Sequence, residues 1–557
     1  MESLIQTLPA EVVHLIAAGE VIDSLAAVVR ELAENSLDAG ATRVAVSVWP
    51  DQWRVRVADN GAGMGLADLR RAATPHSTSK IRDRDDLWKI KSLGFRGEAL
   101  HSLAQLASLE ICSRQASDGA GWRVAYDGDG TAQTPEAVAM APGTIVTIAR
   151  LFEIWPARRE GLPPLAQQLR AIQRVIQQMA LCHPTVTWQV EQRDRPWFSL
   201  WPGETAQALI PQMLREVRPG DLQTVTLPVL LEDDLPAGQI EAVVGLPDRC
   251  HRRRPDWVCV AMNGRMVRSP ELEQAALGAF RRTLPRDRHP VCFLHLQVPP
   301  EAIDWNRHPA KAEIYLHQAE RWQDCAREAI AQALHLSAAQ LPAGHYADRV
   351  GSVLKAAEAG GAYHASRTVQ PADTPPSLRG LRAIAQVHNM YILAEHPSGV
   401  WLVEQHIAHE RVLYEELRDR WQTVPLPTPV VLSHLSPAQR EQLQRLGLDV
   451  DLFGEDLWAV RSAPEPLAAR PDCADALIEL SLGGDLETAL VAVACRTAIR
   501  NGTPLSLPEM QTLLDRWQHT QNPRTCPHGR PIYLSLEESS LARFFRRHWV
   551  IGKSHGI

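Results

Sequence analysis

Apolar and polar positions follow two different periods along the first 200 residues. From Ala26 to Asp38 the apolar side chains recur at helical spacing, and Gly40 follows the end of the pattern. Thr42–Trp49 and Trp53–Ala58 each alternate residue by residue, as half-buried strands do, and a Pro-Asp-Gln turn separates them. The order helix, strand, hairpin, strand predicts an α/β sandwich rather than a parallel βαβ sheet.

A second α/β pattern follows. Val258–Met262 and Val291–Val298 predict strands, and Glu271–Arg281 between them predicts a helix. Residues 335–377 are rich in Ala, Gly, Ser and Pro and poor in large apolar side chains, which is typical of a flexible linker.

Order is predicted again after the linker. Ile384–Leu393 and Val400–Val403 read as strands, and a helix is expected from about Gln405. We therefore expect an α/β (α+β) protein with four parts: domains at 1–204, 205–334 and 378–557, and the linker at 335–377.

Composition supports a globular protein and narrows its class. With 557 residues, 45% of them hydrophobic and 22% charged, about three or four domains are expected. No apolar run approaches the roughly 18 residues of a membrane helix, and nine scattered cysteines indicate a reducing cytoplasm rather than a disulfide framework. A formal net charge of −7 argues against a cationic nucleic-acid coat but leaves room for a local basic groove.

The first candidate chemistry is a glycine-rich turn, Asp59–Gly65, directly after a predicted strand. Such a turn lets the backbone approach a ligand closely, although alone it also fits an ordinary polar loop. Glu31 and Asn35 are four residues apart and share a helix face. A carboxylate can activate a water and an amide oxygen can bind Mg²⁺, whereas a solvated helix face is the plain alternative.

Two further segments suit an anion site. Leu93–Leu100 places two glycines before a predicted helix, where free backbone N–H groups can bind phosphate. His76–Lys80 has the composition of a mobile lid, and Gly143-Thr144 offers a hydroxyl at the start of a strand.

Together these segments resemble the GHKL ATPases. The matching motifs, in order, are ELAENSLDAG (31–40), DNGAGMG (59–65), STSKI (77–81), LGFRGEAL (93–100) and GT (143–144). Within that group the chain is similar to the MutL family of mismatch repair proteins, through IAAGEVI (16–22), STSKI, GFRGEAL, PARR (156–159) and NRHPAK (306–311). The resemblance implies a GHKL ATPase sandwich at 1–204, a transducer domain at 205–334 and a dimerisation domain at 378–557.

The resemblance also implies roles for single residues. Glu31 would be the general base, Asn35 would hold Mg²⁺ on ATP, and Asp59 with Thr144 would bind the adenine. Lys311 of the second domain would reach the γ-phosphate and so make ATP binding join the two domains. The remaining nucleotide-site residues implied are Gly63, Lys80, Gly94, Phe95, Arg96 and Gly97.

Arginines of the second domain are candidates for DNA. Arg252 and Arg253 lie in a basic cluster that could bind phosphates without reading sequence, or could be a solvated charge run. In proteins that this chain resembles, the arginine of an Asn-Gly-Arg segment lines the DNA groove, which implies the same for Arg265.

The third domain contains candidate metal ligands. His406 and Glu410 are four apart on the predicted helix, which suits two ligands of one ion. Cys526 and His528 lie two apart on a turn, and Cys495 is a further candidate, although each has an ordinary structural reading.

EQHIAHERVLYE (404–415), ACRTAIR (494–500) and CPHGRP (526–531) are similar to the motifs of nuclease-competent MutL proteins. Carried over, His406, Glu410, Cys526 and His528 would bind Zn²⁺, or Zn²⁺ and Mn²⁺. Glu404 stands where that motif begins with Asp and would be catalytic, and Glu415 would be its last acid.

The resemblance implies an ATP-dependent protein of mismatch repair that couples recognition by MutS to strand processing, with a latent metal-dependent nicking activity. The expected partners are DNA, MutS, a second copy of the chain and a sliding clamp, for which Gln422–Pro427 is a weak candidate that fits a proline-rich loop better. The expected location is the cytoplasm, at the nucleoid. A scaffold without nuclease activity and another GHKL machine, such as a topoisomerase subunit, are the alternatives.

Overall fold

The computed structural model describes residues 10–78, 80, 92–94, 97–231, 238–304, 315–335, 380–538 and 541. Contacts divide the chain into two compact units. The first comprises Met1–Val243, Val258–Ala276 and Cys292–Ala329, and the second comprises Val244–Trp257, Leu277–Val291 and Ile330–Ile557. All but the first residue of the predicted linker lies outside the described residues, so its flexibility stays a prediction.

An eight-stranded sheet forms the larger part of the first unit, in the order β5-β4-β3-β6-β2-β1-β7-β8. The predicted hairpin is confirmed: β1 pairs antiparallel with β2, and a short 3₁₀ turn at Pro50–Gln52 connects them. The strands are β1 Arg43–Trp49, β2 Arg54–Asp59, β3 Ser108–Arg114, β4 Gly121–Tyr126, β5 Glu136–Val138, β6 Gly143–Ala149, β7 Thr187–Gln192 and β8 Arg195–Leu200.

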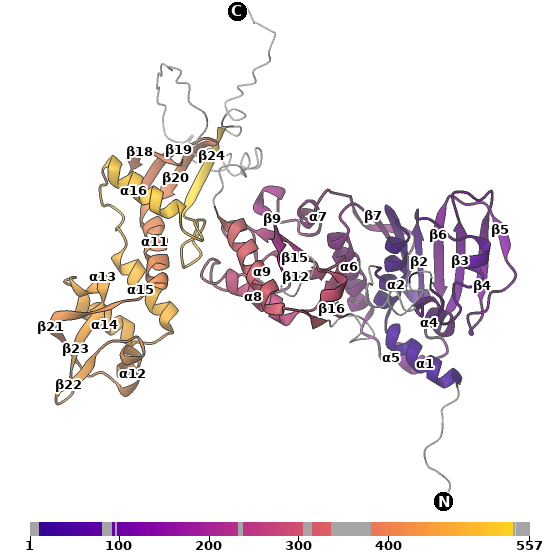
Figure 1. Ribbon diagram of the computed structural model, residues 1–557, viewed down its shortest axis with the longest axis horizontal. Coiled ribbons are helices and arrows are strands. Elements are labelled where there is room, and N and C mark those ends of the chain that lie inside the picture. Colours follow the sequence, from indigo (N-terminus) through magenta and orange to yellow (C-terminus); the bar gives the residue numbers. More distant parts are fainter. Residues whose placement is uncertain are drawn as a thin grey trace, which may run out of the picture. The chain divides into compact units, whose positions relative to one another are not determined.

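Helix α2 (Leu25–Asp38) confirms the predicted helix and packs against β2 and α6 (Leu165–Cys182), as Figure 1 shows. The Ser24 hydroxyl accepts a hydrogen bond from Ala27 N and so caps the helix. Its apolar side chains are buried, which turns its polar face away from the core. The other helices of this part are α1 Ala10–Val21, α3 Leu66–Leu69, α4 Ala99–Leu106 and α5 Pro156–Glu160.

A five-stranded sheet, β13-β12-β15-β10-β9, also belongs to the first unit. The predicted strand Val258–Met262 is confirmed as β12, and β13 (Arg265–Val267) pairs back onto it. Asn263 and Gly264 between them have φ of 47° and 81°, as a two-residue hairpin turn requires. The other strands of this sheet are β9 Leu222–Val229, β10 Gly238–Gly245 and β15 Cys292–Gln297. The remaining elements between residues 206 and 334 are α7 Ala206–Met213, α8 Pro270–Ala279, β16 Ile303–Asp304, β17 Tyr315–Leu316 and α9 Ala319–Leu334, together with β11 His251–Arg252 and β14 His289–Pro290 of the second unit.

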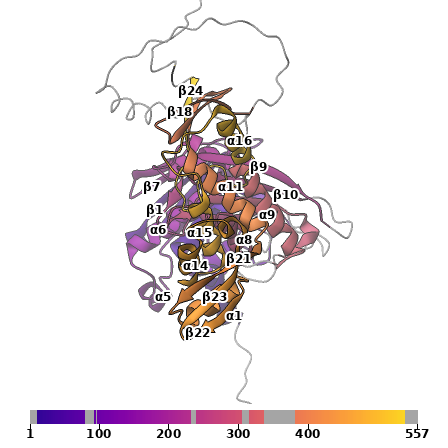
Figure 2. The same ribbon diagram turned by 90° about the vertical axis from the view of Figure 1, so that its left-hand side faces the viewer.

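Helix α11 (Gln405–Asp419) connects the two sheets of the C-terminal part of the second unit. It runs from a four-stranded sheet, β18-β19-β20-β24, to a three-stranded sheet, β21-β23-β22 (Figures 1 and 2). Its first half, with Ile407 and Val412, packs into one apolar core, and its second half, with Tyr414 and Leu417, packs into another. One helix therefore joins two separately packed layers.

The prediction of one strand over Ile384–Leu393 is wrong. The segment is a hairpin of β18 (Arg382–Val387) and β19 (Tyr391–His396), because His388 and Asn389 take positive φ and reverse the chain. The elements that follow are β20 Gly399–Glu404, β21 Thr423–Ser433, α12 Pro437–Arg445, β22 Val450–Gly454, β23 Leu457–Pro464, α13 Glu465–Ala468, α14 Cys473–Ser481, α15 Leu486–Thr497, α16 Leu507–Gln518 and β24 Tyr533–Glu537.

The segment Gln422–Pro427 is not a loop. All but its first residue lie in β21, which is an edge strand of the three-stranded sheet among the described residues, and edge strands tolerate prolines because one of their backbone edges needs no partner strand. Among the helices that the structure describes, none is long and apolar enough to cross a membrane.

Candidate nucleotide site and metal centre

The polar face of α2 forms one side of the candidate nucleotide site. Asn35 Oδ1 accepts a hydrogen bond from Lys80 Nζ at 3.2 Å, and the same ammonium pairs with Asp38. Glu31 lies one helical turn before Asn35, and its side chain is 15% exposed, with one carboxylate oxygen 3.6 Å from Arg30 Nε. The acid, the amide and the lysine predicted to meet the phosphates therefore lie on or against one helix face.

The Leu93-Gly94 turn is bound to the end of the same helix. The backbone N–H groups of Leu93 and Gly94 donate to the two carboxylate oxygens of Asp38 at 2.8 and 2.9 Å. A Cβ on Gly94 would lie 3.0 Å from Lys80 Nζ and 3.5 Å from Asn35 Oδ1. Gly94 thus lies beside Lys80 and Asn35, but a phosphate that took its N–H would have to displace Asp38, and its contact with phosphate stays a prediction.

Asp59 marks the other end of the site. One of its carboxylate oxygens accepts a hydrogen bond from the Ser36 hydroxyl at 2.8 Å, which ties the turn after β2 to α2. Thr144 is the β6 partner of Asp59, and its hydroxyl lies 2.9 Å from that of Ser113. Ser113 also accepts from Met64 N at 2.8 Å, so the glycine-rich loop is fixed to the sheet.

The glycines of these loops meet neighbouring backbone. Gly63 has φ of 69°, and a Cβ there would lie 2.1 Å from Arg114 O. Gly97 has φ of 65°, and a Cβ there would lie 2.6 Å from Ser77 O. Close packing within the chain already requires glycine at both positions, whatever the ligand. Phe95, Arg96 and Lys311 lie outside the described residues.

Three candidate metal ligands come together in the second unit. Glu410 in α11, Cys526 and His528 place one ligand atom each within 4.8 Å of one another. Glu410 and Cys526 are fully buried, whereas the His528 side chain is 35% exposed. A tight turn presents the thiol and the imidazole, since Gly529 N donates to Cys526 O and Cys526 N donates to Arg530 O.

The charges of this cluster interact strongly, and His528 must lose its ring proton before it can bind a metal. His528 Nδ1 lies 2.8 Å from Glu410 Oε1, yet neither atom makes a well-directed hydrogen bond within the described chain. Cys526 and then Glu410 raise the pKa of His528 to about 9. Burial raises the pKa of the Cys526 thiol, but His528 and Arg530 outweigh it and leave the pKa below its usual value. A buried thiolate, carboxylate and imidazole in contact form a donor set that suits Zn²⁺.

The remaining candidates are not part of this three-residue group. His406 Nδ1 donates to Ile499 O at 2.9 Å, and this carbonyl contact leaves Nε2 as the ligand atom. Burial raises the pKa of Cys495, and nearby Glu410 raises it further. Glu404 caps α11 by accepting from Ile407 N at 2.6 Å, while its other oxygen, Oε1, is buried without a hydrogen-bond partner in the described chain.

Glu415 has a structural contact that the sequence did not predict. Its carboxylate accepts from Gln521 N at 2.6 Å and from Asn522 N at 3.0 Å. These amides belong to the segment that leads to Cys526, so Glu415 fixes the path of the chain toward the metal cluster.

The three candidate DNA arginines have different surroundings. Arg252 pairs with Asp256 through two contacts of 2.8 and 3.1 Å, so its charge is balanced locally, whereas Arg253 is exposed. Arg265 is 10% exposed and pairs with Glu34 at 2.8 Å. This buried ion pair gives Arg265 a contact inside the first unit that the sequence did not predict, and its binding to DNA stays a prediction.

Comparison with known proteins decides the family. Three family models match: a histidine kinase-, DNA gyrase B- and HSP90-like ATPase at residues 23–136, a DNA mismatch repair protein C-terminal domain at 221–335, and a MutL C-terminal dimerisation domain at 384–505. The DNA mismatch repair protein MutL of a Nostoc species is 63% identical over 566 residues and covers all of both chains. That of Methanoculleus marisnigri is 33% identical and covers 98% of this chain and 99% of its own.

The chain belongs to the MutL family of DNA mismatch repair proteins. The MutL-family match confirms the GHKL-type ATPase domain and the C-terminal dimerisation domain. A solved structure, the Aquifex aeolicus MutL ATPase domain complexed with ADP, aligns with 56% of this chain at 20% identity and a TM-score of 0.39.

Two MutL-like motifs contact one another in this chain. Arg158 of the PARR segment donates from Nη2 to Gly19 O, at 2.6 Å, in the IAAGEVI segment. Asp38, Ser36 and Glu34 were missed as site residues, although each lies within three residues of Asn35 on the recognised motif. Nothing in the sequence pointed to Ser113, because it is joined to the site only by sheet pairing.

Two histidines hold the Asn263-Gly264 turn of this MutL-family chain and predict a pH effect. His295 Nε2 accepts from Gly264 N at 3.1 Å, and His183 Nε2 lies 2.9 Å from Gly264 O. Burial, and then the neighbouring His183, lowers the pKa of His295 to about 4 from a usual 6.5. The unfolded chain therefore takes up this proton first, so the stabilisation is complete above pH 6.5 and declines as the pH falls toward 4.

We expect His295 to account for a loss of about 2 kcal/mol in the free energy of unfolding between pH 7 and pH 5. Urea unfolding of the wild type and of His295→Gln, which keeps an acceptor but does not titrate, measures this contribution. The variant should lose less stability over the same range, and an equal loss in the two proteins would contradict the assignment.

Proposed function

We propose that this chain is an ATP-hydrolysing switch of mismatch repair. The single observation that carries the proposal is the convergence of Asn35, Lys80 and Gly94 on the polar face of α2. Glu31 is then the general base for the attacking water, Asn35 binds Mg²⁺ on the phosphates, and Asp59 with Thr144 binds the adenine. Lys311, from the transducer domain at 205–334, would reach the γ-phosphate and complete the site. The proposal keeps the expected domain bounds of 1–204, 205–334 and 378–557, with the linker at 335–377.

Asn35→Ala tests the Mg²⁺ assignment. Because the amide oxygen is the proposed ligand, the variant should lose the increase in ATP affinity that Mg²⁺ gives, whereas ATP binding without Mg²⁺ should change little. Titration of ATP into the full chain with Mg²⁺ and with EDTA measures the difference. Asn522→Ala, which changes an asparagine of the C-terminal part, is the control, and unchanged Mg²⁺ dependence in Asn35→Ala would remove the assignment.

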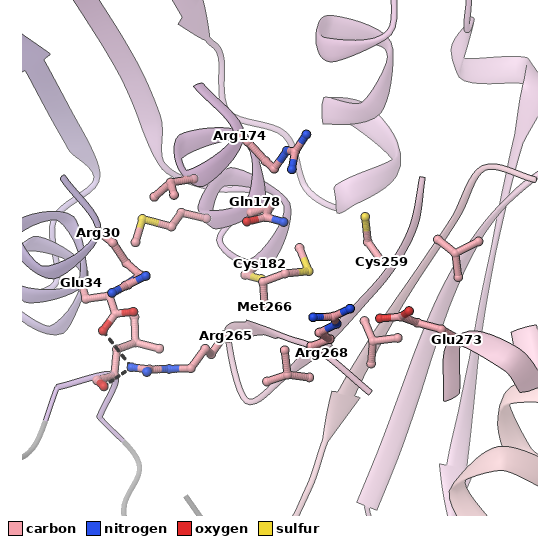
Figure 3. Close-up of a pocket in the computed structure, with 17 residues that line it drawn as sticks. Arg30, Glu34, Arg174, Gln178, Cys182, Cys259, Arg265, Met266, Arg268 and Glu273 are labelled. Carbon is pink, nitrogen blue, oxygen red and sulfur yellow. Dashed lines mark hydrogen bonds and ion pairs between the residues drawn. The ribbon is translucent and has the colours of Figure 1, made fainter. Parts of the chain in front are cut away.

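Sequence-independent DNA binding forms the second part of the proposal. Arg30, Arg174, Arg265 and Arg268 line one cavity of about 460 Å³ in the first unit (Figure 3). A group of guanidinium groups around one hollow suits backbone phosphates, and such binding weakens steeply with salt. Several arginines on one cavity support DNA binding more than Arg252 alone does, although Arg265 already pairs with Glu34 as Arg252 pairs with Asp256.

We propose that the C-terminal part holds the homodimer and binds metal. Glu410, Cys526 and His528, with His406 and Cys495 beside them, would hold Zn²⁺, and a second, Mn²⁺ ion would use the neighbouring acids. The metal supplies a Lewis acid and an activated water for cutting a phosphodiester. Support comes from the donor set itself and from Glu410 Oε1, Glu404 Oε1 and His528 Nδ1, which are buried without well-directed hydrogen bonds in the described chain.

The proposed partners are MutS, DNA and a second copy of the chain, with a sliding clamp as a further candidate and the nucleoid as the place of action. A scaffold that recruits a separate nuclease is the competing function, because Glu404 is one methylene longer than the aspartate of nuclease-competent relatives. Nicking of supercoiled plasmid by the full chain with Mn²⁺ decides between them: if the wild type never nicks, even with its clamp, the scaffold function stands.

A further inference from the structure

Arg265 joins three elements that are far apart in the sequence. Its Nη2 donates to Glu34 Oε2 at 2.8 Å and to the carbonyl oxygen of Leu93. Glu34 lies on α2 between Glu31 and Asn35, and Leu93 precedes Gly94. Figure 3 shows the Arg265 side chain extended toward Glu34, with the dashed contacts at its tip. One guanidinium therefore touches both the helix and the turn that form the proposed phosphate end of the site.

The backbone that carries Arg265 is itself held firmly. Asn263 exchanges two hydrogen bonds of 2.8 Å with the backbone of Val298, at the end of β15. Gly264 is fixed between His183 and His295, as described above. The hairpin turn thus has few ways to move alone, and a shift of the five-stranded sheet would be passed to Arg265.

Hydrogen bonds from two different residues hold the Leu93-Gly94 turn. Asp38 binds its two N–H groups, and Arg265 binds its carbonyl. Arg265 and Glu34 are nearly buried, so water does not readily replace either contact. Removal of Arg265 takes away its guanidinium contacts to the turn and to Glu34, while the two Asp38 contacts to the turn remain.

We propose that Arg265 is a positioning residue for ATP hydrolysis, which sets the Gly94 turn against Glu31 and Asn35 and passes movements of the β12–β13 hairpin to the nucleotide site. The inference rests on the proposed ATPase and adds the regulation of that same site. Arg265 touches neither water nor nucleotide in this role. Its loss should lower turnover, because small displacements of reacting groups reduce rates strongly, but should spare contacts at the adenine end, where Asp59 binds Ser36.

The test compares full-length variants in two assays, ATP turnover and ADP affinity. In Arg265→Ala we expect kcat to fall by about 10²-fold, with ADP affinity close to that of the wild type. Arg265→Lys, which keeps the charge on a shorter arm, should recover part of the turnover. Because loss of the Arg265 cation beside the buried Glu34 carboxylate can impair folding, Glu34→Gln/Arg265→Met removes both charges together and should show the same fall in kcat with ADP affinity retained.

Arg193→Ala is the matched control, since it removes an exposed ion pair with Asp51 in the same unit and should leave turnover unchanged. Three results are distinguishable. If the wild type does not hydrolyse ATP, the proposed function fails. If Glu31→Ala is inactive but all Arg265 variants turn over like the wild type, only the positioning role fails. If Arg265→Ala loses DNA binding and keeps its DNA-free turnover, Arg265 is a DNA residue and the inference is overturned.

Discussion

Glu31→Ala should lower ATP turnover by about 10²- to 10⁴-fold while ATP remains bound. A positioned general base contributes about 10²- to 10⁴-fold to rate, and loss of it affects the attacking water rather than the nucleotide. The Glu31 carboxylate suits this role because it is only partly exposed and lies one turn from Asn35 on α2. Its neighbour Arg30, 3.6 Å away, keeps a cation beside the carboxylate.

Two measurements on the full chain separate the chemical step from binding. Single-turnover hydrolysis should fall by the factor given above, and the affinity for ATP with Mg²⁺ should stay near that of the wild type. Glu136→Ala, which removes an exposed acid of β5 in the same unit, should leave both values unchanged. Persistent turnover in Glu31→Ala would show that another group activates the water, and loss of ATP binding would show that Glu31 holds the nucleotide instead.

The sequence was most informative where one periodic pattern decides one element. The predicted α2, β1, β2 and β12 are confirmed within one or two residues, because each buries a regular apolar face. Helix α1 was not predicted, and Ile384–Leu393 was read as one strand because its apolar residues continue across the turn. In that segment the turn residues, His388 and Asn389, carried the better signal.

Contacts across long separations could not be read from the pattern. Arg265 and Glu34 are 231 residues apart, and their pairing depends on how the two sheets of the first unit pack. The resemblance implied a DNA contact for Arg265, and the structure adds its ion pair with Glu34 of α2. Similarly, Asp38 lies in the recognised motif at 31–40, but the motif does not predict that its carboxylate accepts hydrogen bonds from the backbone N–H groups of Leu93 and Gly94. Those contacts depend on the folding of the turn against the helix.

In the metal cluster, too, the sequence predicted the local spacing of the ligands but not the contacts between distant segments. The spacing of His406 and Glu410 correctly gave one helix face, and the Cys-x-His turn was recognised as a possible ligand pair. That Cys526 and His528 meet Glu410 rather than another acid depends on the contacts of α11 with the segment after α16. Glu415 helps to fix that segment through two backbone amides, a role that its place in the motif did not suggest.

Glu410→Gln should eliminate Mn²⁺-dependent nicking and leave ATP turnover intact. Glutamine has nearly the same shape as glutamate but is neutral and a much weaker metal ligand. The substitution therefore keeps the packing at this fully buried position and removes the carboxylate from the donor set. Metal analysis of the purified variant should show less bound zinc than in the wild type. Glutamine is preferable to lysine here, because a buried ammonium next to Arg530 would itself unfold the site.

The control for this experiment is Glu441→Gln, which changes an exposed acid on α12 and should nick like the wild type. A variant that lost zinc but still nicked would place the catalytic metal elsewhere and leave this cluster a structural role. A wild type that binds zinc at the cluster but never nicks would instead favour the scaffold. Glu404 Oε2 accepts the hydrogen bond from Ile407 N that caps α11, so Oε1 is the oxygen available to a metal. If the wild type does not nick because the Glu404 side chain is too long, Glu404→Asp should gain nicking activity.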